Sequence, residues 1–212
     1  MYTPDKLSGR GRPRSQDGPE DYHCRGYLPH LEQKPVQVIT FRLADSLPKD
    51  VIDQWKLEME IVDDEIRQKD NKVRLRKMID QYEDAGYGRC FLKDKRIAKL
   101  VEDALFFQDG RQYHLVRWCI MPNHVHVMIE PMESFKLSTI LRGWKSYTSH
   151  EAKKILEIDG PFWMPEYFDR YVRDMNHYKN AIAYIDANPV KAGLTKRPSD
   201  WRWSSAYWES HI

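Results

Sequence analysis

Two histidines, at positions 124 and 126, are the residues of this chain best suited to chemistry. They lie in the apolar segment 118–130, whose valines, isoleucines and methionines predict a buried strand. Side chains alternate faces along a strand, so His124 and His126 project from one face and can share a divalent cation. A metal held by two histidines leaves positions for substrate oxygens, as catalytic sites do. Taken alone, however, such a pair is more often an ordinary polar strand face.

The residues before the pair strengthen the metal interpretation. Pro122 and Asn123 predict a turn or bulge directly before His124. Bulges and turns of this kind re-aim side chains beside active sites.

A second element carries residues that can complete such a site. A helix is expected from about Asn176, ending near Asn188 because Pro189 follows. Tyr184 and Asn188 are four positions apart and therefore share a helix face. Beside a two-histidine metal site they would supply a nucleophile and a third metal ligand. That combination suits phosphoryl transfer through a covalent phosphotyrosine.

Spacing alone does not select Tyr184 among the twelve tyrosines, because a tyrosine at helical spacing is more often a core residue. Tyr147 and Tyr178 are the competing nucleophiles, and Tyr178 is expected on the far side of the helix from Tyr184. Phosphate oxygens favour Mg²⁺ as the metal, and the imidazoles make Mn²⁺ a suitable substitute.

The remaining pattern predicts the elements that would position these residues. The expected elements are a strand at 36–43, two helices within 48–86 that break near 69–72, a helix around 97–106, antiparallel strands at 112–120 and from 124, a helix at 134–156, and a loop with a short extended segment at 160–173.

Composition indicates a globular chain. With 212 residues, 41% hydrophobic and 31% charged, it can bury a core as one domain. No run is long and apolar enough for a membrane span, and the N-terminus lacks a secretory h-region. Three unevenly spaced cysteines fit a reducing cytosol. We therefore expect a cytoplasmic protein without membrane partners, although the net charge of +2 does not by itself indicate nucleic-acid binding.

Basic residues are gathered in two places that could contact DNA. Residues 1–24 are expected to form a flexible basic arm, followed by a single domain at 25–212. The helix at 134–156 has a basic, aromatic face, for which single-strand binding and an ordinary solvated surface are equally consistent. The candidate DNA contacts are Arg10, Arg12 and Arg14 of the arm, Arg42 of the first strand, and Lys136, Arg142 and Lys145 of the helix.

Two motifs carry a family resemblance when taken together. Met121-Pro122-Asn123-His124-Val125-His126 is followed nearly sixty positions later by the run from Tyr184 to Leu194. The pair resembles the motifs of the REP-associated tyrosine transposases, relatives of the single-tyrosine HUH transposases of small bacterial insertion sequences. Supporting matches lie at 38–43, Trp163, 167–170 and 201–205.

The resemblance implies a fold and a role for each motif residue. The fold would be α+β, a ferredoxin-like or RRM-like sandwich whose central antiparallel sheet carries the HUH motif, with helices packed on it. His124, His126 and Asn188 would bind the metal, and Tyr184 would become linked to the 5′ phosphate of cleaved DNA. The enzyme would cleave and rejoin single-stranded DNA at repetitive palindromic hairpins, and we expect a monomer associated with the nucleoid.

Two other functions stay open at this point. A non-catalytic hairpin-DNA-binding protein of the same fold would bind DNA without cleaving it. A metal-dependent hydrolase using water would release free products without a covalent adduct. The chain also departs from the family pattern at Met164-Pro165 and in its arginine-rich arm, which leaves recognition of the DNA sequence open.

Overall fold

The computed structural model describes residues 36–48 and 84–211 continuously, the backbone of 22–25 and 28–31, and positions 50, 51, 53, 74, 77–79, 81 and 82. Arg10, Arg12, Arg14 and the expected helix break near 69–72 lie outside the described residues. The last positions assigned to the arm enter strand β1 (Tyr22–Arg25), which pairs antiparallel with β2 (Leu28–Leu31).

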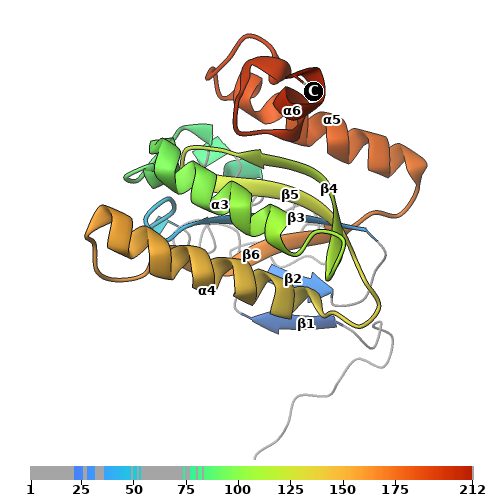
Figure 1. Ribbon diagram of the computed structural model, residues 1–212, viewed down its shortest axis with the longest axis horizontal. Helices are drawn as coiled ribbons and strands as arrows, with labels where there is room; N and C mark the ends of the chain where they lie inside the picture. Colours follow the sequence, from blue (N-terminus) through green and yellow to red (C-terminus); the bar gives the residue numbers. More distant parts are fainter. Residues whose placement is uncertain are drawn as a thin grey trace, which may run out of the picture.

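The main sheet has four antiparallel strands. They are β3 (Gln37–Leu43), β4 (Tyr113–Ile120), β5 (His124–Pro131) and β6 (Trp163–Tyr171), in the spatial order β4-β5-β3-β6. With the helix Lys95–Phe107 leading into β4 and the helix Leu137–Leu156 between β5 and β6, this strand order is the ferredoxin-like arrangement (Figure 1). β5 is an inner strand, so the histidine pair lies in the middle of the sheet, as the fold expectation required.

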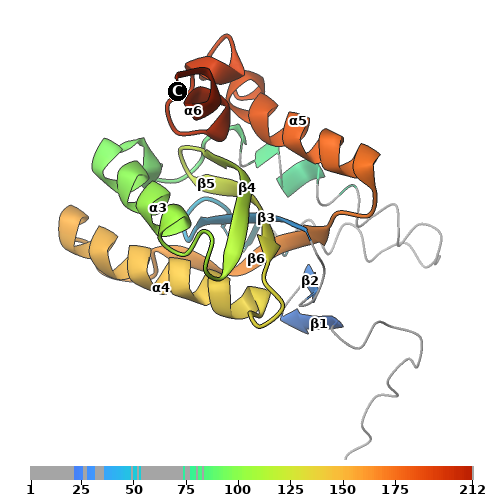
Figure 2. The same cartoon turned by 45° about the vertical axis from the view of Figure 1, so that its right-hand side comes forward.

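Helices cover both faces of this sheet. α3 (Lys95–Phe107) and α4 (Leu137–Leu156) lie side by side on one face, and α5 (Met175–Lys191) lies on the other (Figures 1 and 2). Short pieces complete the chain: the 3-10 helices η1 (Phe91–Lys93) and η2 (Pro198–Asp200), and α6 (Ser205–His211). No helix in the described part of the chain is long and apolar enough to cross a membrane.

The alternation along β5 assigns each residue to a face. Val125, Val127 and Ile129 are fully buried in the core under α3 and α4, where each contributes about 1.5–3 kcal/mol. Met128 belongs instead to the smaller cluster beneath α5. Because His124 and His126 have the same parity as Met128, they face α5. The element predicted to bring the tyrosine therefore covers the face that carries the histidines.

The prediction of a loop with a short extended segment at 160–173 is wrong, because β6 is a full edge strand paired with β3. Between Phe41 and Leu43 the register shifts, so that residues 164–166 face one residue of β3. Pro165, which has no N–H for the ladder, falls within this bulge on an edge strand. Lys145 of α4 donates through Nζ to the carbonyls of residues 164, 165 and 166, at 2.9, 3.1 and 3.3 Å.

The expected helix end near Asn188 is also wrong, since α5 continues to Lys191 with Pro189 inside it. A proline within a helix leaves the carbonyl four residues earlier without its usual donor. Here the side-chain nitrogen of Asn188 donates to the carbonyl of Tyr184 at 2.8 Å and approaches that of Ile185 at 3.5 Å. The carbonyl that loses its donor to Pro189 is that of Ile185, and the Asn188 side chain supplies it with the longer of these two hydrogen bonds.

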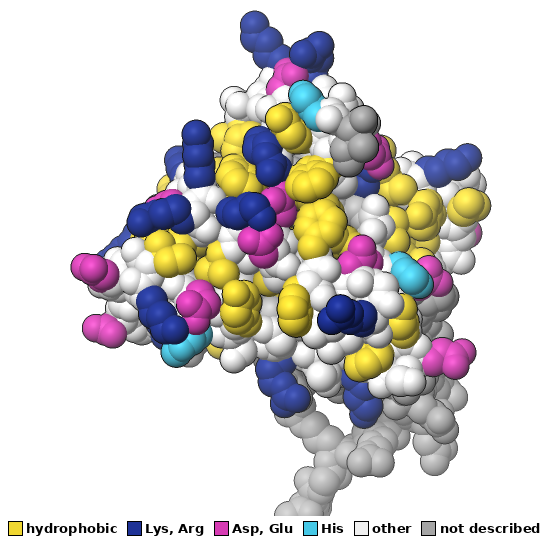
Figure 3. Space-filling view, viewed as in Figure 1, with side chains coloured by type: hydrophobic (Ala, Val, Ile, Leu, Met, Phe, Trp, Pro, Cys, Tyr) yellow, Lys and Arg dark blue, Asp and Glu magenta, His cyan; other side chains and the backbone are white. Residues whose placement is uncertain are grey.

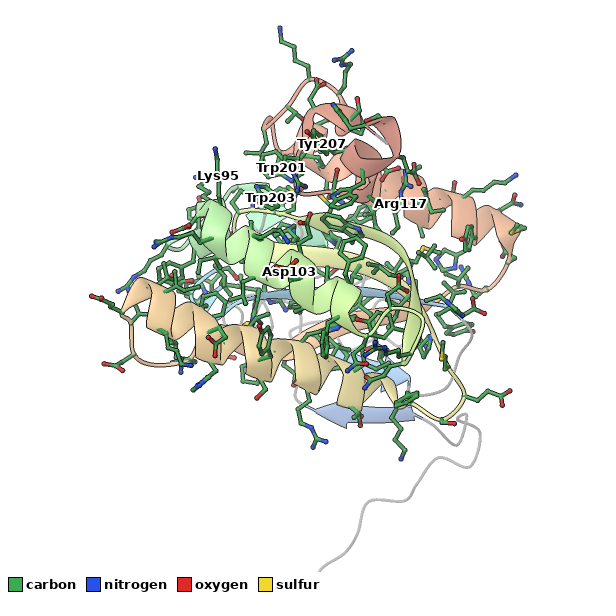
Figure 4. All side chains as sticks on the ribbon, in the orientation of Figure 1. Lys95, Asp103, Arg117, Trp201, Trp203 and Tyr207 are labelled. Atoms are coloured by element: carbon green, nitrogen blue, oxygen red, sulfur yellow. The ribbon has the colours of Figure 1, made fainter. Side chains whose placement is uncertain are left out.

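The C-terminal segment is fastened to α3 by a buried carboxylate. Glu102 accepts hydrogen bonds from Arg202 at 3.0 Å and from the Trp208 indole at 3.1 Å. The Arg202 guanidinium also lies over the rings of Trp203 and Tyr207. Figure 4 shows Trp203 and Tyr207 in the C-terminal segment near α3. The segment also pairs with the end of β4, where the backbone N–H of Ile120 donates to the carbonyl of Trp203.

Candidate metal and nucleophile site

The two histidines converge on one point. Their Nε2 atoms lie 2.9 Å apart, with the rings nearly perpendicular, and the residues are only 1% and 2% exposed. Two nitrogen ligands bound to one metal at about 2.1 Å, at an angle near 90°, would be separated by about 3 Å. The spacing of the pair therefore matches a shared cation.

The orientation of His124 is fixed by its neighbour. Asn123 donates from Nδ2 to the carbonyl of Tyr87 at 3.0 Å, which turns its Oδ1 toward His124. That Oδ1 lies 2.7 Å from Nδ1 of His124 and can only accept, so the ring proton is on Nδ1. Nε2 then keeps its lone pair for a metal. Burial, with the Arg42 guanidinium nearby, lowers the pKa of His124 to about 3, so the ring is neutral.

His126 has an equivalent support from the neighbouring strand. Thr40 lies directly opposite it in the β3–β5 register, and Thr40 Oγ1 is 2.9 Å from Nδ1 of His126. The hydroxyl can accept the Nδ1 proton and so leave Nε2 free for coordination. Such outer hydrogen bonds are typical of histidine ligands, because they fix the tautomer and the ring orientation.

Replacing Thr40 with valine keeps the shape of the side chain and removes this acceptor. We expect Thr40→Val to weaken Mn²⁺ binding by about 10- to 100-fold without unfolding the protein. Isothermal titration of Mn²⁺ into the two proteins would measure the change. Equal affinities would show that the Thr40 hydroxyl does not support His126.

Tyr184 lies against the histidine pair. Its ring meets that of His126 edge to face, with the centroids 5.5 Å apart, and Lys191 Nζ lies 4.5 Å from the centre of the tyrosine ring. Tyr178 also packs on the cluster beneath α5, which corrects the expectation that it lies on the far side of the helix. Tyr178 lies about 9 Å from Tyr184 along the axis of α5. Tyr147 is exposed on α4, on the other side of the sheet.

Asn188 is the remaining predicted ligand. It is 1% exposed and lies one turn after Tyr184 on the same face of α5. Because its side-chain nitrogen is engaged by helix carbonyls, Oδ1 is the atom it can offer to a cation. Among the described residues no group of three His, Cys, Asp or Glu side chains could hold a metal. Asn188 shares the α5 face of Tyr184, which contacts His126, and an amide oxygen together with two imidazoles is a donor set that fits Mg²⁺ or Mn²⁺.

An ion pair holds α5 on the sheet. Arg117 of β4 donates from Nε and Nη2 to the two carboxylate oxygens of Asp186, at 2.8 and 2.7 Å, and also bonds Glu209 of α6. Both members of the Arg117–Asp186 pair are largely buried. Figure 4 shows Arg117 where β4 meets the α5 and α6 region. Since Asp186 is two residues from Tyr184, the pair fixes the helix that carries the tyrosine.

Removing Arg117 leaves the Asp186 carboxylate buried without its partner. We expect Arg117→Ala to destabilise the protein by about 3 kcal/mol and to lower Tm by about 6–12 °C in thermal unfolding. The double substitution Arg117→Met with Asp186→Leu, which removes both charges, should recover most of the loss. A Tm within about 1 °C of the unsubstituted protein for Arg117→Ala would contradict this role.

The predicted DNA-contacting residues lie on opposite faces of the sheet. Arg42 lies opposite His124 in the register, is 4% exposed, and faces the site. Lys136 and Arg142 are exposed on α4, across the sheet from the histidines. Lys145 is committed to the β6 bulge, and burial together with Arg42 lowers its pKa to about 7. On the face seen in Figure 3, basic, acidic and hydrophobic side chains are interspersed.

Sequence reasoning missed the supporting residues of the site. Thr40 could have been found from strand pairing once β3 was placed beside β5. Asn123 was noted only as a turn residue, and its contact to Tyr87 spans 36 positions. The Arg117–Asp186 pair spans 69 positions and has no local signal.

A histidine pair on an inner strand of a ferredoxin-like sheet, facing a helix with a tyrosine and an asparagine, is the arrangement expected of a single-tyrosine transposase. Residues 87–188 match the family model described as Transposase IS200 like. The chain is 29% identical over 96 residues to the REP-associated tyrosine transposase of Escherichia coli (strain K12). The match covers 45% of this chain and 55% of that protein.

Two further relatives agree with this match. A putative REP-associated tyrosine transposase of Haemophilus influenzae (strain ATCC 51907 / DSM 11121 / KW20 / Rd) is 24% identical over 103 residues, covering 44% of this chain and 58% of the relative. The matched segment thus spans little more than half the length of either curated relative. A solved REP-associated tyrosine transposase bound to a REP hairpin has the same fold, with a TM-score of 0.54 and 17% identity, covering 86% of this chain and 83% of that one. The resemblance to the REP-associated tyrosine transposases is confirmed.

Proposed function

We propose that this protein is a metal-dependent single-stranded DNA endonuclease and strand transferase that works through a 5′-phosphotyrosine. The observation that carries the proposal is the position of Tyr184 against the converging histidines, with the rings 5.5 Å apart. The relatives named REP-associated tyrosine transposases support a substrate class of single-stranded DNA that folds into hairpins at repetitive palindromes. Such an enzyme would act on the chromosome, in the cytoplasm.

The chain's own residues suit each part of the reaction. His124, His126 and the Asn188 oxygen would hold Mg²⁺ or Mn²⁺, which when bound polarises a non-bridging oxygen of the phosphate. Tyr184 Oη attacks phosphorus and loses its proton to solvent, the bond from phosphorus to the 3′ oxygen breaks, and that oxygen takes up a proton. The new phosphotyrosine bond conserves the phosphodiester energy, so a 3′-OH can attack it and reseal the strand without ATP.

We further propose that one chain holds a complete site. Tyr184 on α5 contacts His126 of the same chain, and Arg117 binds Asp186 within that chain. Under this proposal a monomer is the active unit, and dilution would not lower the activity per molecule.

A denaturing gel tests the function directly. The protein would be incubated with Mn²⁺ and a 5′- and 3′-labelled hairpin oligonucleotide taken from repeats flanking its own gene. A protein-linked band that carries the 3′ part of the DNA and disappears with EDTA is expected. Cleavage products without a linked band would indicate a water-using hydrolase. Tight, salt-sensitive binding without any cleavage would indicate a DNA-binding protein that lacks the chemistry.

A further inference from the structure

The site extends beyond His124, on the side away from Tyr184. Tyr184 contacts His126, whereas Arg42 is the residue paired with His124 in the β3–β5 register. Arg42 donates from Nε to Sδ of Met164 at 3.3 Å, which directs its side chain toward the β6 bulge. Tyr184 therefore lies at the His126 end of the pair, and Arg42 lies beside His124 on the neighbouring strand.

Two tyrosines lie at the His124 end of the pair, where Asn123 bonds the carbonyl of Tyr87. Tyr82 packs on the cluster of Leu47 and Ile79, which Met164 also contacts. Tyr82 and Tyr87 stack on each other, with ring centroids 4.1 Å apart and planes at 25°. Tyr87 is 52% exposed, so one ring face rests on Tyr82 while much of the residue is open to solvent. The described helical positions between 74 and 84, which include Tyr82, are drawn in teal in Figures 1 and 2. They lie on the sheet face opposite α3 and α4.

The backbone of Tyr87 is fixed relative to the histidine pair. Its carbonyl accepts the 3.0 Å hydrogen bond from Asn123, whose other amide atom holds His124. Gly88 follows with φ +85°, and a Cβ there would lie 2.7 Å from the Asp45 carbonyl oxygen. The next residue, Arg89, donates its backbone N–H to Asp45 at 2.8 Å. These contacts hold the backbone on both sides of the Tyr87 ring in a fixed position relative to His124.

The direction of the reaction assigns this surface to one side of the cleaved bond. In phosphoryl transfer the attacking and leaving oxygens lie roughly in line across the phosphorus. With Tyr184 attacking from the His126 side, the leaving 3′ oxygen lies toward His124 and Arg42. We propose that Arg42 and the Tyr82–Tyr87 pair hold the nucleotide on the 5′ side of the scissile phosphate, with its base stacked on the open face of Tyr87. This inference rests on the proposed function.

Stacking of one base on an aromatic side chain changes affinity by about 5- to 100-fold. We expect Tyr87→Ala to weaken binding of the cleavable oligonucleotide within this range, and Tyr87→Phe to retain affinity because it keeps the ring. Since a base stack carries no charge, the dependence of binding on salt should stay the same for all three proteins.

Fluorescence of 2-aminopurine locates the contact. The cleavage position is first mapped with the unsubstituted protein. The Tyr184→Phe protein, which cannot consume the DNA, is then titrated with oligonucleotides carrying 2-aminopurine directly 5′ or directly 3′ of that position. Strong quenching is expected for the 5′ probe, lost on adding Tyr87→Ala and retained on adding Tyr87→Phe. Tyr147→Ala, which removes an equally exposed tyrosine on α4, is the matched control and should leave quenching unchanged.

Three results would overturn the inference: quenching that survives Tyr87→Ala, quenching lost equally at the two probe positions, or no quenching at either. None of these results affects whether the unsubstituted protein forms the covalent adduct on the same oligonucleotide. The adduct assay would therefore fail only if the proposed function itself is wrong.

Discussion

Replacing Tyr184 with phenylalanine should abolish the covalent adduct and strand cleavage, by at least about 10⁴-fold, while the protein still binds hairpin DNA. The substitution removes one oxygen atom and keeps the ring that packs edge to face on His126. Fold and DNA affinity should therefore persist. Single-turnover cleavage and adduct formation on a denaturing gel measure the first effect, and filter binding measures the second.

The matched controls are the other candidate nucleophiles. Tyr178→Phe changes a tyrosine on the same helix and the same cluster, and Tyr147→Phe changes one across the sheet. Both variants should form the adduct at close to the normal rate. An adduct that persists in Tyr184→Phe and disappears in Tyr178→Phe would reassign the nucleophile.

Replacing His126 with alanine should remove the response of the protein to Mn²⁺. A cation present at 100 times its dissociation constant stabilises the folded state by about 2.7 kcal/mol, which for a chain of this size raises Tm by about 5–10 °C. His126→Ala leaves His124 alone on the strand, so we expect almost no Mn²⁺-dependent shift. Adduct formation should fall by more than about 100-fold, which is the upper range for loss of an outer support.

Differential scanning fluorimetry with and without Mn²⁺ checks this prediction independently of activity. His114→Ala is the matched control, because His114 is an exposed histidine on β4 outside the site. It should keep the full shift. A normal Mn²⁺ shift in both His124→Ala and His126→Ala would show that the cation binds elsewhere.

The central part of the fold was predictable because its signals are local. The alternation of His124, Val125, His126 and Val127 assigns the strand and its two faces at once. The four-residue spacing of Tyr184 and Asn188 assigns one helix face. Neither pattern depends on distant residues, and the structure places both as expected.

The errors lie at two prolines whose surroundings are compensated by side chains. Only a short extended segment was predicted at 160–173, but β6 runs through Pro165, and the three carbonyls around it are satisfied by Lys145 from another element. Pro189 predicted the end of a helix, but the Asn188 side chain replaces the missing donor. The Lys145 contacts could not be predicted from the sequence, because the donor comes from another element, whereas the Asn188 contacts are local and could have been anticipated from the residue before Pro189.

Asn123 would couple the two binding events proposed above, that of the cation and that of the base. Its amide spans from the Tyr87 carbonyl, at 3.0 Å, to the Nδ1 atom of His124, at 2.7 Å. A base that settles on Tyr87 would then alter the environment of a metal ligand, and thermodynamic linkage requires the reverse effect to be equal. If bound DNA raises the affinity for the cation by some factor, the bound cation raises the affinity for DNA by the same factor. The enzyme would then assemble its catalytic site most completely on the strand that it is able to cut.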